Sequence, residues 1–578
     1  MAPTDQLQEV KIMLHGTAAS EGIGIGKVML IEEHSLEYTP RTVTDTEAES
    51  QRFKAAVDAF CYNTEKQAEN LRSSAGEKEA EILAGHIQII RDPYLSGEIE
   101  KLIADGQCAE SALEHMCDMF IAMFSAADDE LTKQRAADVR DIKSGVLGIL
   151  LGVNEIKVSD APKGTVLVAR ELTPSVTAGI VKENIAGIIT ETGGTTSHSA
   201  ILARALEIPA VLSVEGVASS LKNGDTVVVD GSEGAVIVNP DDNTVAEYSK
   251  KRDAFLAERK ELENYRGRET KSASGEVYEL FCNIGKPEDA VKAVDADGEG
   301  VGLFRTEFLF MDRTSIPTED EQFDAYKKAA LILKGKSLII RTLDIGGDKD
   351  IPYLGLEKEE NPFMGFRAIR YCLKNRELFK SQIKAILRAS AFGDVKIMFP
   401  LITTMDELRE GKKLVAECKA DLRNMGINFN ENIQVGVMVE TASAAVIADM
   451  LAKEADFFSI GTNDLTGYTM ACDRGNNDVS YLYSPLQPSV LRMIKRTIEC
   501  GVQNGISVGM CGEAAANKLM IPLLISFGLT EFSVSAPSVL NVRKIISTWT
   551  KEEADKVTAK VLEMSTQQEI VEYLKSVV

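Results

Sequence analysis

The chain is poor in histidine and tryptophan, with five histidines and one tryptophan among its 578 residues. No run approaches about 18 consecutive apolar residues, so no segment is expected to span a membrane. The first residues, MAPTDQLQEVK, lack a basic stretch followed by an apolar core, so we expect no secretory signal peptide. The nine cysteines form no CxxC pair, and this scattered, odd set favours the reducing cytoplasm over a disulfide framework.

Basic residues are also in deficit, since 64 Lys and Arg against 88 Asp and Glu leave a formal net charge of −24. This charge argues against nucleic acid or an anionic membrane as a partner, and it permits a basic protein partner. Part of the acidic excess lies in residues 44–150, where a solvated helical surface is the simplest interpretation.

The length of the chain predicts more than one domain. Residues 44–152 contain four segments with helical spacing of apolar residues, so we expect an inserted helical subdomain over residues 34–152. Strand-like runs such as GTVLVAR and DTVVVD predict one α/β domain built from residues 1–33 and 153–240. The polar, charged stretch 241–270 is expected to be a helical linker.

Apolar, strand-like runs alternate with helical stretches through residues 271–578. They are YELFCN, VGLFR, SLIIRT, VKIMFP, IQVGVMVE, DFFSIG, ISVGMC and EFSVS. Eight such strands predict a closed (β/α)8 barrel, in which reactive groups sit where the strands end. Those ends carry Arg305, Arg341, Glu440, Asn463 with Asp464, and Cys511.

Two of these residues, Arg305 and Arg341, end the second and third strands. Two guanidinium groups at one barrel mouth suit a phosphate, because each makes paired hydrogen bonds to its oxygens. Arg474, in DRGN after the sixth strand, could add a third guanidinium, and Lys349, in GGDK, a further positive charge. A structural ion pair is the alternative for any one of these residues.

Two carboxylates, Glu440 and Asp464, end neighbouring strands five and six. Beside a phosphate they would require a cation, and hard oxygen ligands favour Mg²⁺. Capping of the following helices is an equally good interpretation from spacing alone. Cys511 ends strand seven, where a thiol could donate a proton, although inert packing is the commoner role of a single cysteine.

One histidine lies in GGTTSHSAILARALEIPAV, residues 193–211. Ser197 is predicted to cap a helix whose first residue is His198. The positive end of a helix dipole favours neutral imidazole, which is nucleophilic, and favours a phosphoryl group bound to it. The segment therefore suits a phosphorylated histidine, and a histidine hydrogen-bonded in a turn is the alternative.

The segment GGTTSHSAILARALEIPA resembles the phosphohistidine motif of the phosphoenolpyruvate-utilising enzymes. The segments VGLFRTEFLFMDR, RTLDIGGDK, NPFMGFRAIR, VGVMVETASAA, DFFSIGTNDLTGYTMACDRGN and GMCGEAA resemble the catalytic barrel of the same family. The resemblance covers nearly the whole chain from about residue 16. Length, domain order and helical insertion are similar to those of members that phosphorylate a small carrier protein.

The resemblance implies roles for the residues identified above. His198 would be phosphorylated on Nε2, and Cys511 would protonate the enolate carbon as pyruvate forms. Glu440 and Asp464 would hold Mg²⁺, and Arg204 and Thr173 would lie near the phosphohistidine. The residues implied to bind phosphoenolpyruvate are Arg305, Arg341, Asn463, Asp464, Arg474 and Lys349.

The resemblance also implies partners. The helical insertion 34–152 would bind a phosphocarrier protein of the HPr type, as the first step of phosphotransferase-system sugar uptake. The barrel would form a homodimer, and the enzyme would be cytoplasmic. Thr195 and Gly467 differ from residues common in the family, which leaves carrier preference open.

Other functions are weighed against this one. Phosphoenolpyruvate synthases and pyruvate phosphate dikinases share both domains, but they need a nucleotide-binding domain for which this chain has no room. Nitrogen-related members of the family usually carry an N-terminal sensory domain, which is not expected here. A purely regulatory protein would not need His198, Glu440, Asp464 and Cys511 together.

Overall fold

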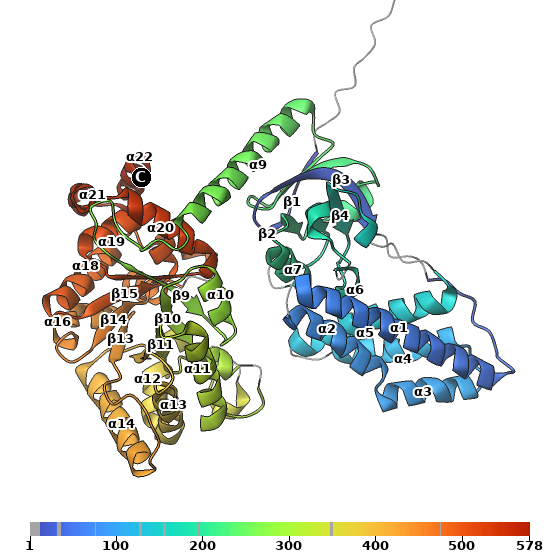
Figure 1. Ribbon diagram of the computed structural model, residues 1–578, viewed down its shortest axis with the longest axis horizontal. Coiled ribbons are helices and arrows are strands. Elements are labelled where there is room, and N and C mark those ends of the chain that lie inside the picture. Colours follow the sequence, from blue (N-terminus) through green and yellow to red (C-terminus); the bar gives the residue numbers. More distant parts are fainter. Residues whose placement is uncertain are drawn as a thin grey trace, which may run out of the picture. The chain divides into compact units, whose positions relative to one another are not determined.

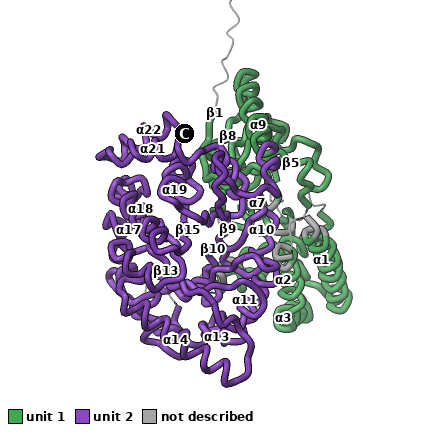
Figure 2. Tube along the Cα trace, turned by 60° about the vertical axis from the view of Figure 1, so that its left-hand side comes forward, with its two compact units in different colours: residues 1–259 green, residues 260–578 purple. Residues whose placement is uncertain are grey.

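The computed structural model describes residues 12–31, 36–74, 77–126, 130–153, 158–177, 179–194, 197–311, 313–346, 351–473 and 476–578. The chain divides into two compact units, residues 1–259 and 260–578, shown in green and purple in Figure 2. In the described part of the chain, no helix combines the length and apolar character needed to cross a membrane.

The first unit contains an eight-stranded mixed sheet with the strand order β1-β8-β7-β3-β4-β5-β6-β2. Its central strands β3 to β6 run parallel, and β1, β2, β7 and β8 pair antiparallel with their neighbours. Strands such as TVLVA are buried along their whole length, which explains their continuous apolar character. The strands are β1 (Ile12–His15), β2 (Thr17–Ser20), β3 (Ile23–Ile31), β4 (Thr165–Ala169), β5 (Ile185–Thr190), β6 (Ala210–Leu212), β7 (Thr226–Asp230) and β8 (Ala235–Val238), with helices α6 (Pro174–Thr177), α7 (His198–Leu206) and α8 (Val217–Ser220).

A group of helices is inserted between β3 and β4 (Figure 1). They are α1 (Thr46–Ser74), α2 (Glu77–Ile90), α3 (Pro93–Ala104), α4 (Ala109–Ser125) and α5 (Glu130–Leu151). The four predicted helical segments correspond to α1, α2, α4 and α5, whereas α3 was not expected.

The unexpected helix α3 begins with a proline and contains a glycine, so its sequence resembles a loop. Asp92 caps it by accepting hydrogen bonds from the amides of Tyr94 at 2.9 Å and Leu95 at 3.1 Å. Pro93 occupies the first helical position, where the missing N–H costs nothing and the fixed φ fits a helix. Burial of Leu95, Ile99 and Ile103 against the other helices then stabilises α3.

Within the predicted linker 241–270, the structure contains α9 (Asp242–Leu262) and the 3-10 turn η3 (Glu263–Tyr265). The last residues of the linker, from η3 to Thr270, are bonded to the barrel through Arg543, which is only 2% exposed. Its guanidinium donates to Tyr265 O at 3.1 Å, Thr270 Oγ1 at 3.0 Å and Asp297 O at 2.8 Å. These bonds attach the end of the linker to the barrel.

The second unit is the predicted closed barrel of eight parallel strands (Figure 1). Its strands are β9 (Glu279–Ile284), β10 (Gly300–Arg305), β11 (Ser337–Arg341), β12 (Val395–Phe399), β13 (Val435–Val439), β14 (Phe457–Ile460), β15 (Ser507–Cys511) and β16 (Glu531–Val534). β16 pairs with β9, which closes the barrel. The helices are α10 (Asp289–Asp295), α11 (Glu319–Leu333), α12 (Ala368–Lys374), α13 (Arg376–Ala389), α14 (Met405–Asn424), α15 (Ala442–Val446), α16 (Ala448–Leu451), α17 (Thr462–Met470), α18 (Pro488–Gln503), α19 (Ile521–Phe527), α20 (Val539–Thr548), α21 (Lys551–Glu563) and α22 (Gln567–Val577).

Alternate residues of each strand point into the barrel, where they form their own apolar cluster. This cluster consists of Leu303, Ile339, Met398, Met438, Phe457 and Cys511. The barrel interior is therefore packed, and the polar groups described next lie at the carboxyl ends of its strands.

Candidate active site

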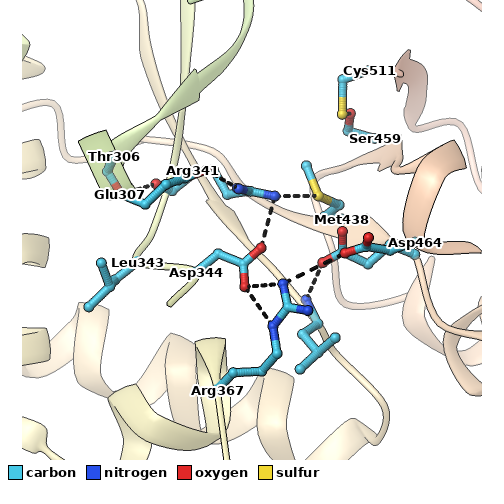
Figure 3. A network of polar contacts seen from close by, with 12 residues as sticks. Thr306, Glu307, Arg341, Leu343, Asp344, Arg367, Met438, Ser459, Asp464 and Cys511 are labelled. Carbon is cyan, nitrogen blue, oxygen red and sulfur yellow. Dashed lines mark hydrogen bonds and ion pairs between the residues drawn. The ribbon is translucent and has the colours of Figure 1, made fainter. Parts of the chain in front are cut away.

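Arg305 and Arg341 are register partners at the carboxyl ends of β10 and β11, as the sequence predicted. Arg305 is exposed, whereas Arg341 is only 8% exposed and lies in the barrel mouth. Arg341 Nη2 donates to Glu307 Oε1 at 2.7 Å, and its Nη1 lies 3.0 Å from Asp344 Oδ2 (Figure 3). Burial by itself would lower the pKa of Arg341, but the neighbouring carboxylates raise it, so the guanidinium stays charged.

Several polar atoms in this mouth are buried but make no hydrogen bond to described residues. They are Glu307 Oε2, Arg341 Nε, Thr342 Oγ1 and Thr462 Oγ1. Buried polar groups are normally paired, because an unmade hydrogen bond costs roughly 1–3 kcal/mol. Such a concentration at the ends of barrel strands indicates a site built to receive a polar ligand.

A second buried arginine, Arg367, was not among the predicted site residues. Its Nη2 and Nε donate to Asp344 Oδ1 at 2.7 and 3.1 Å, and Nη2 lies 3.7 Å from Asp464 Oδ2 (Figure 3). Arg367 is located between strands, immediately before α12, so the search for residues at strand ends missed it. The sequence signal for Arg367 is the segment NPFMGFRAIR, which contains it and resembles the catalytic barrel of the family.

Three carboxylates, Asp344, Glu440 and Asp464, meet between these arginines. Each offers one oxygen, and these three oxygens lie within 4.8 Å of one another. Glu440 and Asp464 follow the paired strands β13 and β14, so their predicted proximity is confirmed. Asp344, which follows β11, is a third member that the sequence analysis did not identify.

The alternative that Glu440 caps a helix is not supported. The N-cap of α15 is Thr441, whose hydroxyl accepts from the Ala444 amide at 3.0 Å. Glu440 is 2% exposed, and its Oε1 accepts from the Leu401 amide at 2.6 Å. Burial, followed by repulsion from Asp464 and Asp344, raises the pKa of Glu440. A divalent cation would relieve this repulsion, and an all-oxygen donor set fits Mg²⁺.

Cys511 lies at the end of β15 and is 6% exposed. Ser459 Oγ donates to Cys511 Sγ at 3.2 Å (Figure 3). Burial raises the pKa of this thiol to about 11, so it carries its proton at neutral pH. A buried, protonated thiol is compatible with both interpretations of Cys511, the proton donor and the packing residue.

Asn463 and Asp464 occupy the first turn of α17, directly after β14. Asn463 is half-buried, and its carbonyl accepts from Tyr483 Oη at 3.0 Å. Lys349 and Arg474 lie outside the described residues, so their predicted positions at the mouth remain predictions.

His198 is the first residue of α7 and Ser197 is its N-cap, as predicted. Ser197 Oγ accepts from the Ala200 amide at 3.3 Å, and the His198 side chain lies outside the described residues. Arg204, one turn further on, donates to Ala19 O at 3.1 Å. Thr173 directly precedes α6.

Three family models match the chain. They describe the PEP-utilising enzyme N-terminal region over residues 15–135, the mobile domain over residues 161–234 and the PEP-binding domain over residues 259–550. The PEP-binding model covers the barrel with Arg341, Glu440 and Cys511, and the mobile-domain model covers His198.

Curated relatives match over nearly the full length. A "Phosphoenolpyruvate-protein phosphotransferase" of Bacillus subtilis (strain 168) is 47% identical and covers 98% of this chain and 99% of its own. A protein of the same description from Priestia megaterium is 45% identical, with 97% of this chain and 98% of its own covered. A solved structure described as "NMR solution structure of Enzyme I (nEIt) protein" is 37% identical over 42% of this chain and 99% of its own, with a TM-score of 0.38. The chain therefore belongs to the phosphoenolpyruvate-utilising enzymes, among the phosphoenolpyruvate-protein phosphotransferases.

Proposed function

We propose that the chain transfers the phosphoryl group of phosphoenolpyruvate to its own His198 and then to a histidine of an HPr-type phosphocarrier, releasing pyruvate. The observation that carries this proposal is the barrel mouth, where buried Arg341 and Arg367 surround a cluster of three carboxylates. The positively charged arginines suit the phosphate and carboxylate groups of a phosphorylated carboxylic acid, and the negatively charged carboxylates suit a cation bound beside it.

The arginines orient the substrate and stabilise charge during transfer. Arg341 and Arg367 are held in fixed positions by carboxylates, so they present preorganised donors to phosphate oxygens. Arg305, exposed at the adjacent strand end, would contact the same group, as would Asn463, Arg474 and Lys349. In-line displacement requires His198 to reach the phosphorus, and α7 would place its imidazole at the positive end of a helix.

The carboxylates Glu440 and Asp464, joined by Asp344, would hold Mg²⁺. Bound there, the ion would neutralise charge that develops on the phosphoryl and enol oxygens. The Leu401 amide keeps Glu440 Oε1 oriented, so the carboxyl group is positioned before any ligand enters.

Cys511 would protonate the enolate carbon to give pyruvate. Its raised pKa keeps the proton on sulfur at neutral pH, and Ser459 would stabilise the thiolate formed by the transfer. Thr173 and Arg204 would act near the phosphohistidine in the first unit.

The helical insertion 34–152 would bind the phosphocarrier, and the barrel would form the homodimer in the cytoplasm. The acidic character of the insertion supports attraction to a basic carrier surface, which added salt should weaken.

The test uses the full chain, Mg²⁺ and phosphoenolpyruvate labelled with phosphorus-32. We expect acid-labile label on the wild-type chain and none on His198→Ala. His115→Ala is the matched control, because His115 is exposed on α4 of the insertion and this test contains no carrier protein. Equal labelling of His198→Ala and wild type would exclude His198 as the acceptor.

A further inference from the structure

A carboxyl group is buried inside the barrel, below the layer that holds Cys511. Glu531 is the first residue of β16 and is 4% exposed, and its Oε1 makes no hydrogen bond to a described residue. The proposed function assigns it no role. A role in packing alone would not explain this residue, because a buried carboxyl group with an unpaired oxygen is costly to retain.

Two glycines make the space that this carboxyl occupies. A Cβ at Gly302 would lie 2.4 Å from Glu531 Oε1, and one at Gly509 would lie 2.8 Å from it. Any side chain at either position would collide with the carboxyl group. The barrel interior is therefore shaped around the carboxyl of Glu531.

The strand register places Glu531 two strands away from Ser459, with only Gly509 between them. Ser459 pairs with Gly509, and Gly509 pairs with Glu531, so the three residues form one row across β14, β15 and β16. Register partners in a sheet project to the same face, and Gly509 has no side chain to separate its neighbours. The Glu531 carboxyl reaches over Gly509, because its Cδ lies 2.8 Å from the position that a Cβ at Gly509 would take. The gap that remains to Ser459 is about one strand spacing, ~4.8 Å, which one bridging water would span.

Ser459 is in turn bonded to the thiol, since its Oγ donates to Cys511 Sγ at 3.2 Å. The row thus leads from Glu531, across Gly509, to Ser459 and then to Cys511. At its other end, Glu531 pairs with Glu279, which is exposed at the amino-terminal end of the barrel. Solvent protons therefore have an entry opposite the substrate mouth.

We propose that Glu531 is the proton donor that recharges Cys511 through Ser459 during turnover. This inference rests on the proposed function, in which Cys511 gives its proton to the enolate carbon. The Cys511 thiolate then takes the Ser459 hydroxyl proton, and Ser459 Oγ takes the carboxyl proton of Glu531. The Glu531 carboxylate regains a proton from water at the amino-terminal end, so one proton enters for each pyruvate formed.

The charges around Glu531 suit this role. Burial, followed by Glu279 on β9, raises the pKa of Glu531 to about 8, whereas Lys396 on β12 lowers it. Glu531 is therefore protonated at neutral pH and close enough to its pKa to release the proton. Its negative form also raises the pKa of Cys511, after burial, which favours return of the proton to sulfur.

The test follows carbon and hydrogen exchange together, with the full chain and without a carrier protein. The chain is incubated in deuterium oxide with Mg²⁺, phosphoenolpyruvate and carbon-14-labelled pyruvate. Carbon-14 appearing in phosphoenolpyruvate counts reversible phosphoryl transfers, and deuterium in the pyruvate methyl group reports exchange of the Cys511 proton with solvent. The deuterium incorporated per carbon exchange is the measured ratio.

Glu531→Gln removes the exchangeable carboxyl proton, so we expect this ratio to fall at least about tenfold while carbon exchange continues. Ser459→Ala should lower the ratio similarly. Because both residues belong to one route, the double variant Glu531→Gln/Ser459→Ala should have a ratio no lower than that of the more impaired single variant. Glu531→Asp keeps a carboxyl group and should recover part of the ratio. A merely structural role would lower both exchanges together and leave the ratio unchanged.

The matched control is Ser526→Ala. Ser526 lies on α19, outside the barrel strands, and its hydroxyl donates to Asp555 Oδ1 at 2.7 Å. Its ratio should equal that of wild type. A wild-type ratio in Glu531→Gln would overturn the proposal, whereas absence of carbon exchange in wild type would overturn the proposed function instead.

Discussion

The guanidinium of Arg367 forms two hydrogen bonds with one oxygen of the Asp344 carboxylate, at 2.7 and 3.1 Å, while Asp344 Oδ2 lies 3.0 Å from Arg341. One buried carboxylate thus positions two arginines of the barrel mouth.

Arg367→Lys keeps the positive charge but loses the planar group that bonds Asp344 twice. Loss of one charge-assisted hydrogen bond costs about 1.5–3 kcal/mol, so we expect self-labelling at low phosphoenolpyruvate concentration to fall roughly 10- to 100-fold. The rate of label incorporation against substrate concentration measures this. Arg370→Lys is the control, because Arg370 contacts the backbone carbonyls of Met364 and Gly365. Equal losses of self-labelling in the two variants would contradict a specific role for Arg367 in substrate binding.

Metal binding should depend on the three clustered carboxylates. Mg²⁺ at a hundredfold excess over its Kd would stabilise the wild-type protein by about 2.7 kcal/mol, which raises the thermal unfolding midpoint. Asp344→Asn and Glu440→Gln should each diminish this rise, because each replaces a negatively charged carboxylate with a neutral amide. Asp449→Asn is the control, since Asp449 is paired with Arg496 at the surface at 2.7 Å. An undiminished rise in both cluster variants would place the metal elsewhere.

Cys511 should react slowly with iodoacetamide at pH 8, because a thiol with a pKa of about 11 is almost entirely protonated there. Cys472, which is half-exposed, is the internal comparison, and mass spectrometry of the digested protein locates the label. We expect label on Cys472 first, with Cys511 labelling increasing as the pH approaches 11. Preferential labelling of Cys511 at pH 8 would contradict the protonated thiol.

Cys511→Ala should slow pyruvate formation about 10²- to 10⁴-fold.

The stability of the barrel should change with pH through Glu531. Its pKa is about 8 in the folded protein against an ordinary value of 4.5, so the folded state binds this proton more tightly. The resulting stabilisation is present at low pH and is lost, by up to about 1.4 kcal/mol per pH unit, as pH rises toward 8. Glu531→Gln should therefore unfold at a higher temperature than wild type at pH 8.5 and differ little at pH 4.5. The exposed Glu552→Gln should match wild type at both pH values.

Arg543→Ala should destabilise the second unit by about 3–5 kcal/mol, because it leaves buried acceptors and the Asp297 carboxylate without their partner. The adjacent Lys544→Ala should have little effect, since Lys544 pairs with Glu261 near the surface. Urea unfolding followed by fluorescence compares the two variants. Similar urea midpoints for the two variants would show that the buried Arg543 contacts add little to the stability of the second unit.

Much of this architecture could be predicted from local patterns. Apolar runs predicted each strand of the barrel, and Ser197 before His198 predicted the start of α7. The helix α3 was missed because Pro93 and Gly97 resemble loop residues, although Asp92 and burial of one helix face stabilise it. Local propensity is a weak signal when a cap and tertiary packing oppose it.

The sequence by itself determined the strand ends, and so placed Arg341, Glu440 and Cys511 at one face of the barrel. Only the tertiary structure brought Arg367 to Asp344, because both lie in the connection between β11 and β12 and meet when this connection folds back on itself. The same holds for the row of Ser459, Gly509 and Glu531, because register between strands depends on how the whole barrel packs. Spacing along a chain reports which face a residue occupies, whereas contacts between distant segments are decided by packing.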